Sequence, residues 1–176
     1  MLLLPGLVGC IGRFEHQKNL LALVEAMSGL PGARLLLVGD GSQRAEILNR
    51  AERFRVRMEL VGVVPQLQLP ALLRRMELFV LQSHYEGHPK ALLEAMACGL
   101  PVIGTDVPGI RDVIIHGKTG YLCDPSVEGI RDALRTVLAN AALRQRLGYE
   151  ARVAVEARCA LPRIVEQELS VLQEFV

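Results

Sequence analysis

Short, almost wholly apolar runs alternate with helical hydrophobic patterns along this chain of 176 residues. Runs such as 34–38 and 78–81 lack the polar alternation of a half-exposed strand, so they predict strands that are buried on both faces. Strands of that kind are typical of parallel sheets covered by helices on both sides. The sequence therefore predicts an α/β fold in one domain that spans residues 1–176.

The expected elements follow from these runs and from the turn residues between them. We predict strands at 7–12, 34–38, 58–61, 78–81, 101–105 and 121–123, and helices at 18–30, 43–54, 70–76, 89–98, 110–115, 127–139 and onwards to residue 176. Ser42 and Ser126 are expected to cap the helices that follow them, and Pro89 and Gly99 mark the two ends of one helix. Ligands of parallel sheets bind beyond the carboxyl ends of the strands, so we expect site residues in the strand-to-helix loops.

Composition excludes several functional classes. Hydrophobic residues make up 51% of the chain and charged residues 22%, which is enough apolar material for a folded core. A net charge of +1 and an aromatic content of 4%, with no Trp, argue against a nucleic-acid partner. The four cysteines are far apart and form no zinc-binding spacing, which predicts reduced thiols and no metal centre. Nothing in the sequence has the pattern of a signal peptide or a membrane span, so we expect a cytoplasmic protein.

The loop after the first predicted strand combines a glycine with two basic side chains. Gly12 would allow a ligand to approach the backbone closely. Arg13 and Lys18 lie five residues apart between a strand and a helix, and two fixed cations beside a helix start suit a diphosphate. Taken alone this pattern is weak, since a solvated basic turn has the same composition.

The loop after the fourth predicted strand leads into the most clearly delimited helix. Free backbone N–H groups around Gly87 and His88, with the positive end of the helix, could hold an anion. Glu86 precedes the helix and Glu94 lies within it. Eight residues of continuous helix would separate the two carboxylates by about 12 Å, so they cannot share a proton but could grip two parts of one long ligand.

A third loop follows the strand at 101–105 and opens with a Pro-Gly turn. Most of this segment is typical of scaffold rather than of a binding site. A ligand role there would fall on the backbone of Gly109 and Ile110.

Segment 86–103, which reads EGHPKALLEAMACGLPVI, resembles the signature of glycosyltransferase family 4, a large group of retaining enzymes with the GT-B fold. That signature holds two glutamates separated by seven residues, which Glu86 and Glu94 match. Further motifs agree in the same order along the chain: 8–14 (VGCIGRF), 35–41 (LLLVGDG), 109–114 (GIRDVI) and 117–122 (GKTGYL). The resemblance implies a Rossmann-like parallel sheet with helices on both faces, the half of a GT-B fold that binds the nucleotide-sugar donor.

The resemblance also implies roles for individual residues. It implies catalytic roles for Arg13, Lys18 and Glu86. It implies donor-binding roles for Gly12, Gly62, Val63, Gly87, His88, Pro89, Lys90, Ala91 and Glu94. Within these sets the basic pair would bind the diphosphate, Glu94 the ribose, Glu86 the sugar hydroxyls, and the segment at 62–63 the base. The family often has an apolar residue where this chain has His88, so the role of that side chain stays open.

The implied chemistry is retaining sugar transfer without a metal. Transfer passes through an oxocarbenium-like state while the leaving nucleoside diphosphate gains negative charge. Arg13, Lys18 and the helix start near Gly87 could stabilise that charge. The chain has no Asp-x-Asp motif, the metal-binding signature of the other main glycosyltransferase architecture, so no metal or other cofactor is expected.

The resemblance implies an N-terminal acceptor-binding domain, which we expect to lie outside these 176 residues. We therefore expect two partners, a nucleotide-sugar donor and that missing half, through which alone any peripheral membrane association would occur. We also expect the chain by itself to bind donor without transferring sugar. Apolar residues give the last predicted helix one hydrophobic side, which would pack either on the missing half or on its own sheet: Leu161, Ile164, Val165, Leu169, Leu172 and Phe175.

Other functions remain open at this point. A nucleotide-sugar epimerase of the same architecture would yield a rearranged sugar, and a non-catalytic module would bind donor without turnover. The basic pair together with the two glutamates favours the transferase over the epimerase. A dinucleotide-binding oxidoreductase is disfavoured, because the glycines near the start of the chain do not form GxGxxG and no acidic ribose ligand follows at the expected distance.

Overall fold

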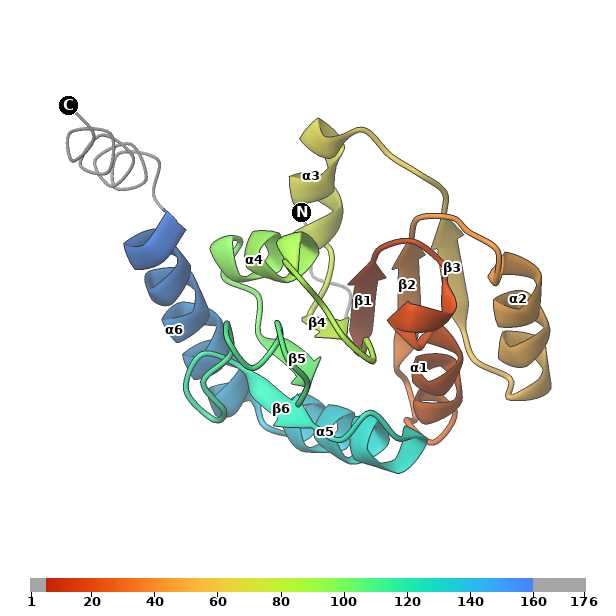
Figure 1. Ribbon diagram of the computed structural model, residues 1–176. Coiled ribbons are helices and arrows are strands. Elements are labelled where there is room, and N and C mark those ends of the chain that lie inside the picture. The colour runs from red at the N-terminus through yellow and green to blue at the C-terminus, as the bar shows by residue number, and fades with distance from the viewer. Residues whose placement is uncertain (1–5, 160–176) are drawn as a thin grey trace.

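The computed structural model describes residues 6–159, and at its centre lies a six-stranded sheet (Figure 1). The strands are β1 (Leu7–Ile11), β2 (Arg34–Val38), β3 (Met58–Val61), β4 (Leu78–Leu81), β5 (Val102–Thr105) and β6 (Tyr121–Cys123). They lie in the order β3-β2-β1-β4-β5-β6, and every neighbouring pair is parallel. The predicted parallel α/β architecture is confirmed.

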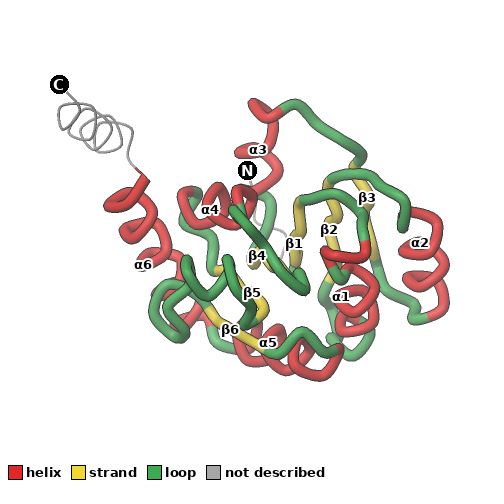
Figure 2. The backbone as a smooth tube through the Cα atoms, viewed as in Figure 1, coloured by secondary structure: helices red, strands yellow, loops and turns green. Residues whose placement is uncertain are grey.

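Helices cover both faces of this sheet, as Figure 1 and Figure 2 show. One core contains buried residues of α1 (Leu20–Met27), α2 (Arg44–Arg53) and α5 (Val127–Ala139). The core on the other face contains residues of α3 (Leu69–Leu73) and α4 (Lys90–Ala97), and α6 (Ala141–Cys159) contributes to both cores. Two short 3-10 helices, η1 (His16–Lys18) and η2 (Gln66–Gln68), precede α1 and α3.

The two central strands explain why the sequence shows no polar alternation. In β1, Val8 and Cys10 join one core while Leu7 and Ile11 join the other. The strand β4 divides in the same way, and each of its residues is buried. Successive side chains of a strand point to opposite faces, so a strand between two helical layers must be apolar at every position. Full burial of one such side chain contributes about 1.5–3 kcal/mol.

Several predicted boundaries agree with the structure. The strands expected at 34–38, 58–61, 78–81 and 121–123 are observed with those bounds. Ser126 caps α5, because its Oγ accepts the N–H of Gly129 at 3.1 Å. Gly99 follows α4 with a φ of +73°, the left-handed conformation that commonly ends a helix.

Other local predictions are wrong. Ser42 does not cap α2, which begins at Arg44, because the Ser42 hydroxyl donates to Glu15 Oε2 at 2.7 Å. The helix predicted at 18–30 begins only at Leu20, because Asn19 is left-handed with a φ of +51°. Pro89 is the residue before α4 rather than part of its first turn.

The segment predicted as a helix at 110–115 forms consecutive turns instead. Gly109 has a φ of +82°, and Asp112 Oδ2 accepts its N–H at 3.1 Å, which holds the chain in a turn. Ile110 and Ile114 nevertheless reach the core on the α4 side of the sheet. The hydrophobic spacing that predicted a helix therefore reflects the burial of these two side chains.

The apolar residues expected on the last helix, from Leu161 to Phe175, lie outside the described part of the chain. Within residues 6–159, no helix combines the length and the apolar character needed to cross a lipid bilayer.

Candidate functional site

The loops after β1 and β4 meet at the carboxyl edge of the sheet. The chain order reverses between these strands, because β2 and β3 lie on one side of the pair and β5 and β6 on the other. Such a reversal leaves a crevice outside the carboxyl ends of the two strands, where ligands of open α/β sheets bind. A pocket of about 300 Å³ occupies this position, and its lining comprises Ile11, Gly12, Arg13, Gln17, Lys18, Leu81, Glu86, His88, Pro89, Lys90 and Ala91.

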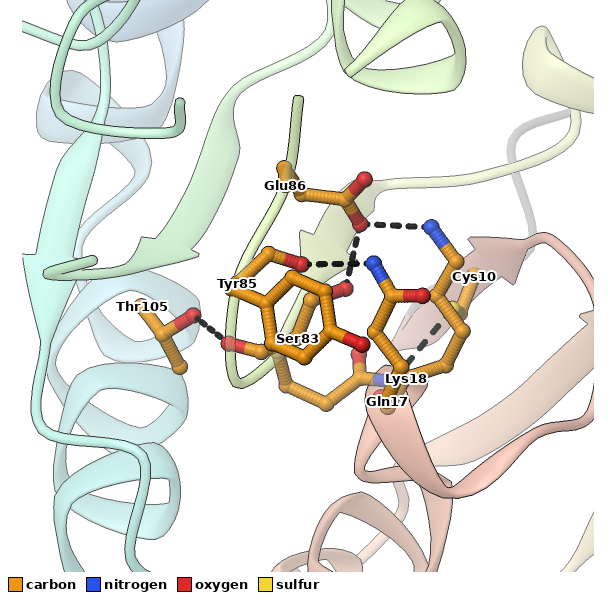
Figure 3. Close-up of polar contacts among 8 residues, drawn as sticks. Cys10, Gln17, Lys18, Ser83, Tyr85, Glu86 and Thr105 are labelled. Carbon is orange, nitrogen blue, oxygen red and sulfur yellow. Dashed lines mark hydrogen bonds and ion pairs between the residues drawn. The ribbon is translucent and has the colours of Figure 1, made fainter. Parts of the chain in front are cut away.

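Lys18 and Glu86 form an ion pair across this crevice (Figure 3). Lys18 Nζ lies 2.5 Å from Glu86 Oε1, and the two side chains are 20% and 6% exposed. The same Glu86 oxygen accepts the Ser83 hydroxyl at 2.5 Å. Within the described residues nothing donates to Glu86 Oε2. One carboxylate oxygen is thus held by the protein, and the other is available to a ligand.

Backbone contacts join the two loops beside this ion pair. The N–H of His84 donates to the Gln17 carbonyl at 2.8 Å, and Gln17 Nε2 donates to the Tyr85 carbonyl at 2.9 Å. The His16 and His84 rings stack next to these bonds, with centroids 5.4 Å apart. Lys18 and Glu86 therefore lie on loops that are fixed to each other.

Arg13 is the unpaired cation of the pocket. It is exposed, and in the part of the chain that the structure describes it forms no ion pair. Its neighbour Gly12 donates its N–H to Val38 at 3.0 Å, which ties the start of the loop to β2. Because no protein anion occupies the Arg13 guanidinium, this side chain can meet a ligand anion without first breaking an ion pair.

Free amide groups lie at the start of α4. Pro89 has no N–H, and its carbonyl accepts the N–H groups of Leu92 and Leu93. Among residues 6–159, none accepts the N–H of Gly87, His88 or Ala91. Unsatisfied amides at a helix N-terminus attract anions. The structure thus shows the free N–H groups that the sequence predicted around Gly87 and His88.

Glu94 lies on α4 with partners of its own. Gln66 Nε2 donates to its Oε1 at 3.3 Å, and Lys90 Nζ lies 3.9 Å from the same oxygen. Glu86 precedes α4, as predicted, and α4 begins only at Lys90, so the separation of about 12 Å expected for continuous helix does not apply to this pair. The two carboxylates still have separate surroundings, so they are not a proton-sharing dyad.

A second hollow adjoins the pocket on the side of β2 and β3. It has a volume of about 240 Å³ and is lined by Ile11, Gly12, Arg13, Val38, Gly39, Asp40, Val63, Val64 and Leu69. Val63 is 80% exposed, although it is apolar. Its neighbour Gly62 does not line either hollow. The segment predicted to contact a base therefore lies beside the pocket, and Val63 is its residue that lines the adjoining hollow.

The third loop supports the site without offering it amide groups. The N–H of Gly109 donates to Asp112, and that of Ile110 donates to the Val107 carbonyl at 3.2 Å. A Cβ on Gly109 would lie 2.1 Å from the Glu86 carbonyl oxygen. Glycine at this position lets the turn pack against the backbone of Glu86, so the segment shapes the site as scaffold.

Buried polar residues beneath the pocket were not among the predicted site residues. Gln82, Ser83 and Thr105 are each 0% exposed and follow or end strands β4 and β5. The sequence held a signal for the first two, because Gln82-Ser83 comes directly after a wholly apolar strand. For this loop the predicted set began at Glu86 and left out the two residues at the end of the strand that support it.

The cysteines are all free thiols. Burial raises the pKa of Cys10 to about 11 and that of Cys123 to about 12, so both are protonated near neutral pH. Across residues 6–159, no group of three or more His, Cys, Asp or Glu side chains is placed to hold a metal ion.

Known proteins share this sequence pattern and fold. The family described as "Glycosyl transferases group 1" matches residues 5–154. N-acetyl-alpha-D-glucosaminyl L-malate synthase of Bacillus anthracis is 35% identical over 161 residues, which are 89% of this chain and 42% of that protein. The chain thus spans about two fifths of the length of this curated relative.

Solved structures show the same fold. Anabaena Alr3699/HepE, crystallised in complex with UDP and glucose, superposes with a TM-score of 0.90 at 22% identity, covering 96% of this chain and 48% of that one. The C-terminal domain of a glycosyl transferase group 1 family protein (LpcC) from Francisella tularensis superposes with a TM-score of 0.78 at 22% identity. The match covers 88% of this chain and 86% of that domain. At this level of identity these likenesses concern the fold.

Proposed function

Since this chain belongs to the glycosyl transferases group 1 family, we propose that it is the nucleotide-sugar-binding half of a retaining, metal-independent glycosyltransferase of family 4. One observation carries the proposal. The pocket at the topological reversal gathers the basic residues Arg13, Lys18 and Lys90, a carboxylate with a free oxygen and the unsatisfied start of a helix. Transfer itself is proposed for a longer protein, of which this chain would supply the donor site.

The diphosphate would lie between the β1 loop and the start of α4. Arg13 and Lys18 reach the pocket from one side, and the free N–H groups of Gly87, His88 and Ala91 lie on the other. Charge-assisted hydrogen bonds from such donors are roughly twice as strong as neutral ones. A helix N-terminus adds a favourable field for negative charge.

The sugar and the nucleoside would extend from the diphosphate in two directions. Glu86 would accept sugar hydroxyls at its free Oε2, beside the backbone of Gly87 and His88. Glu94 would accept from the ribose, since it is one quarter exposed and stands near Gln66 of η2. Val63 would contact the base in the adjoining hollow.

The proposed reaction breaks the bond between the sugar's anomeric carbon and the diphosphate oxygen. The bonding electron pair moves to that oxygen, so negative charge grows on the leaving group while the sugar becomes oxocarbenium-like. Arg13, Lys18 and the amides at α4 would stabilise this growing charge without a metal. An acceptor hydroxyl then attacks from the face that the diphosphate left and gives its proton to the departing diphosphate oxygen, so the new glycosidic bond retains the configuration.

Calorimetry on the 176-residue chain tests the donor site. UDP, GDP and ADP are titrated with and without excess EDTA, and at least one should bind equally well in both conditions. Lys18→Ala should weaken binding of the preferred diphosphate, while Lys118→Ala is the matched control because Lys118 is exposed on the turn before β6. If no diphosphate binds, or if EDTA abolishes binding, the proposed site is wrong.

A further inference from the structure

Buried polar side chains are rare in the described part of this molecule, and they gather beneath the pocket. Gln82, Ser83, Thr105 and Thr119 are the buried polar side chains of residues 6–159. Thr119 stabilises the turn in which it lies, because its hydroxyl accepts the Ile115 N–H at 2.9 Å. The bonds of the other three run towards the Lys18–Glu86 pair. Burying a polar group in an apolar core costs free energy unless a partner offsets it, so this placement calls for a reason.

Ser83 holds the carboxylate. Its hydroxyl donates to Glu86 Oε1 at 2.5 Å, and its carbonyl accepts the Thr105 hydroxyl at 2.6 Å (Figure 3). Because Thr105 is the last residue of β5, this bond fixes the backbone of Ser83 to that strand. With Lys18 on the same oxygen, the Glu86 carboxylate has one orientation, in which Oε2 is the oxygen left for a ligand.

Gln82 holds the lysine. Its Nε2 donates to the Lys18 carbonyl at 2.6 Å, at the residue where η1 ends and the left-handed Asn19 begins the approach to α1. In the described structure, Gln82 Oε1 is buried without a hydrogen-bond partner. The same Nε2 also donates to Cys10 Sγ at 3.6 Å, so its contacts with the Lys18 carbonyl and with that sulfur together determine the orientation of the amide.

We propose that Gln82 and Ser83 are positioning residues that divide the site between them, Gln82 setting Lys18 for the diphosphate and Ser83 setting Glu86 for the sugar. This inference rests on the proposed function, because it assigns ligand groups to Lys18 and Glu86. Neither residue lines the pocket, so neither would touch the donor. Both residues directly follow β4, and from there they fix Lys18 on the loop after β1 and Glu86 on the loop after β4.

The division predicts two different binding defects. Ser83→Ala frees the Glu86 carboxylate to rotate, so it should reduce the ratio of UDP-glucose affinity to UDP affinity roughly tenfold, with UDP affinity within about threefold of wild type. Gln82→Met removes the amide donor with little change in volume. It should reduce the ratio of UDP affinity to uridine affinity roughly tenfold and leave the sugar ratio unchanged.

Calorimetry on the 176-residue chain with uridine, UDP and UDP-glucose measures both ratios, and Thr119→Val is the matched control. That substitution also removes one buried hydroxyl contact, but far along the chain from the two loops, so both ratios should stay at wild-type values. Thermal unfolding shows which variants are folded. If Ser83→Ala does not fold, Thr105→Val replaces it, with a smaller loss of the sugar ratio expected.

The outcomes separate this inference from the proposed function. If wild type binds UDP and Lys18→Ala and Glu86→Gln behave as proposed, but Ser83→Ala and Gln82→Met keep both ratios, the donor site stands and the positioning role is wrong. Equal loss of both ratios in each variant would also overturn it, because a merely structural role gives that result. If wild type binds none of UDP, GDP and ADP, the proposed function fails and this inference fails with it; if GDP or ADP binds in place of UDP, both ratios are measured with that nucleotide and its sugar conjugate.

Discussion

Both edges of the sheet carry an ion pair, but beside the Lys18–Glu86 pair the carboxyl edge also carries polar groups that have no protein partner within residues 6–159. At the amino edge, Glu77 and Arg144 satisfy each other at 2.7 Å, with side chains 21% and 18% exposed. Glu77 also accepts the N–H of Gly6, and Arg144 donates to the carbonyls of Val137 and Leu138. At the carboxyl edge, Arg13 has no ion-pair partner within residues 6–159, and the amides at the start of α4 are unsatisfied.

This difference shows what each edge contributes. The parallel sheet gives both edges similar backbone, so the fold alone does not explain the contrast. Polar groups that satisfy one another stabilise the folded chain. Groups left without protein partners add nothing to folding, but they are available to a ligand. The carboxyl edge is therefore built for binding, and the following predictions test that distinction.

The largest expected effect concerns the carboxyl edge as an incomplete site. We expect the 176-residue chain to form glycoside at least about 10⁵-fold more slowly than a longer protein that also carries the acceptor-binding half. Positioning an acceptor hydroxyl against the donor carbon can supply ~7–11 kcal/mol of the barrier. Product formation from UDP-glucose, with both proteins assayed side by side, measures the difference. Efficient transfer by this chain alone would show that the edge is complete.

Breaking the amino-edge pair should reduce stability without affecting binding. Glu77→Ala leaves Arg144 partly buried without its carboxylate, so the free energy of unfolding should fall by roughly 2–4 kcal/mol, less than for a fully buried pair. Urea unfolding measures the change. Asp132→Asn is the matched control, because the Arg135–Asp132 pair is 58% and 72% exposed, and its loss should cost under about 1 kcal/mol.

The binding measurement decides whether the two edges are independent. UDP affinity of Glu77→Ala should stay at the wild-type value wherever the variant is folded. A loss of UDP affinity comparable to the loss in a carboxyl-edge variant would mean that the edges are coupled, and the proposed division between stability and binding would not hold.

Arg13→Ala should show the reverse behaviour. Loss of a charge-assisted contact should weaken UDP binding by about 1.5–3 kcal/mol. The free energy of unfolding should change by less than about 0.5 kcal/mol, because Arg13 is exposed and unpaired in the described structure. Calorimetry with UDP and uridine, beside urea unfolding, measures both quantities. Equal losses for UDP and uridine would show that Arg13 does not face the diphosphate.

The sequence predicted the sheet well because burial on both faces leaves a direct pattern. Four of the strands were expected with their observed bounds. In β2 and β4 the apolar run ends where the chain leaves the core, whereas β3 and β6 are only partly buried and carry a weaker pattern. The helix predicted at 110–115 is wrong, because Ile110 and Ile114 have helical spacing but reach the core from a turn. Hydrophobic spacing reports which side chains are buried, and does not report the left-handed glycine that prevents a helix.

The candidate site was only partly predictable. The residues that line the pocket came from strand-to-helix loops, where parallel sheets bind ligands, and from the resemblance to a known family. The Lys18–Glu86 ion pair forms because β1 and β4 are neighbours in the sheet. The strand order β3-β2-β1-β4-β5-β6 cannot be deduced from any local sequence pattern. The bond of Gln82 was missed for the same reason, because it joins Gln82 to Lys18, which is distant in sequence. The bond from Ser83 to Glu86 is local, but it was missed because Ser83 is buried below the surface of the loop.

The smallest expected effects separate the two glutamates of the carboxyl edge. Glu94→Gln should weaken binding of uridine and UDP alike by about 1 kcal/mol, because its proposed partner is the ribose. Glu86→Gln should reduce only the added affinity of UDP-glucose over UDP, by about 1.5 kcal/mol, which is no less than the tenfold loss expected for Ser83→Ala. Calorimetry with all three ligands measures these differences, and both substitutions preserve side-chain volume.

Glu86→Gln carries a second, opposite consequence. In the unliganded protein the Lys18 ammonium is paired with Glu86 at 2.5 Å, so a diphosphate must share or replace that partner. Removing the negative charge frees Lys18, and UDP affinity should therefore be unchanged or higher, although UDP-glucose gains less from its sugar. Glu94→Gln offers no such gain, because Glu94 lies 3.9 Å from the exposed Lys90 rather than from Lys18. If both variants lost UDP affinity equally, the carboxyl edge would not divide its carboxylates between sugar and ribose, and Lys18 would depend on Glu86 to be placed for the diphosphate.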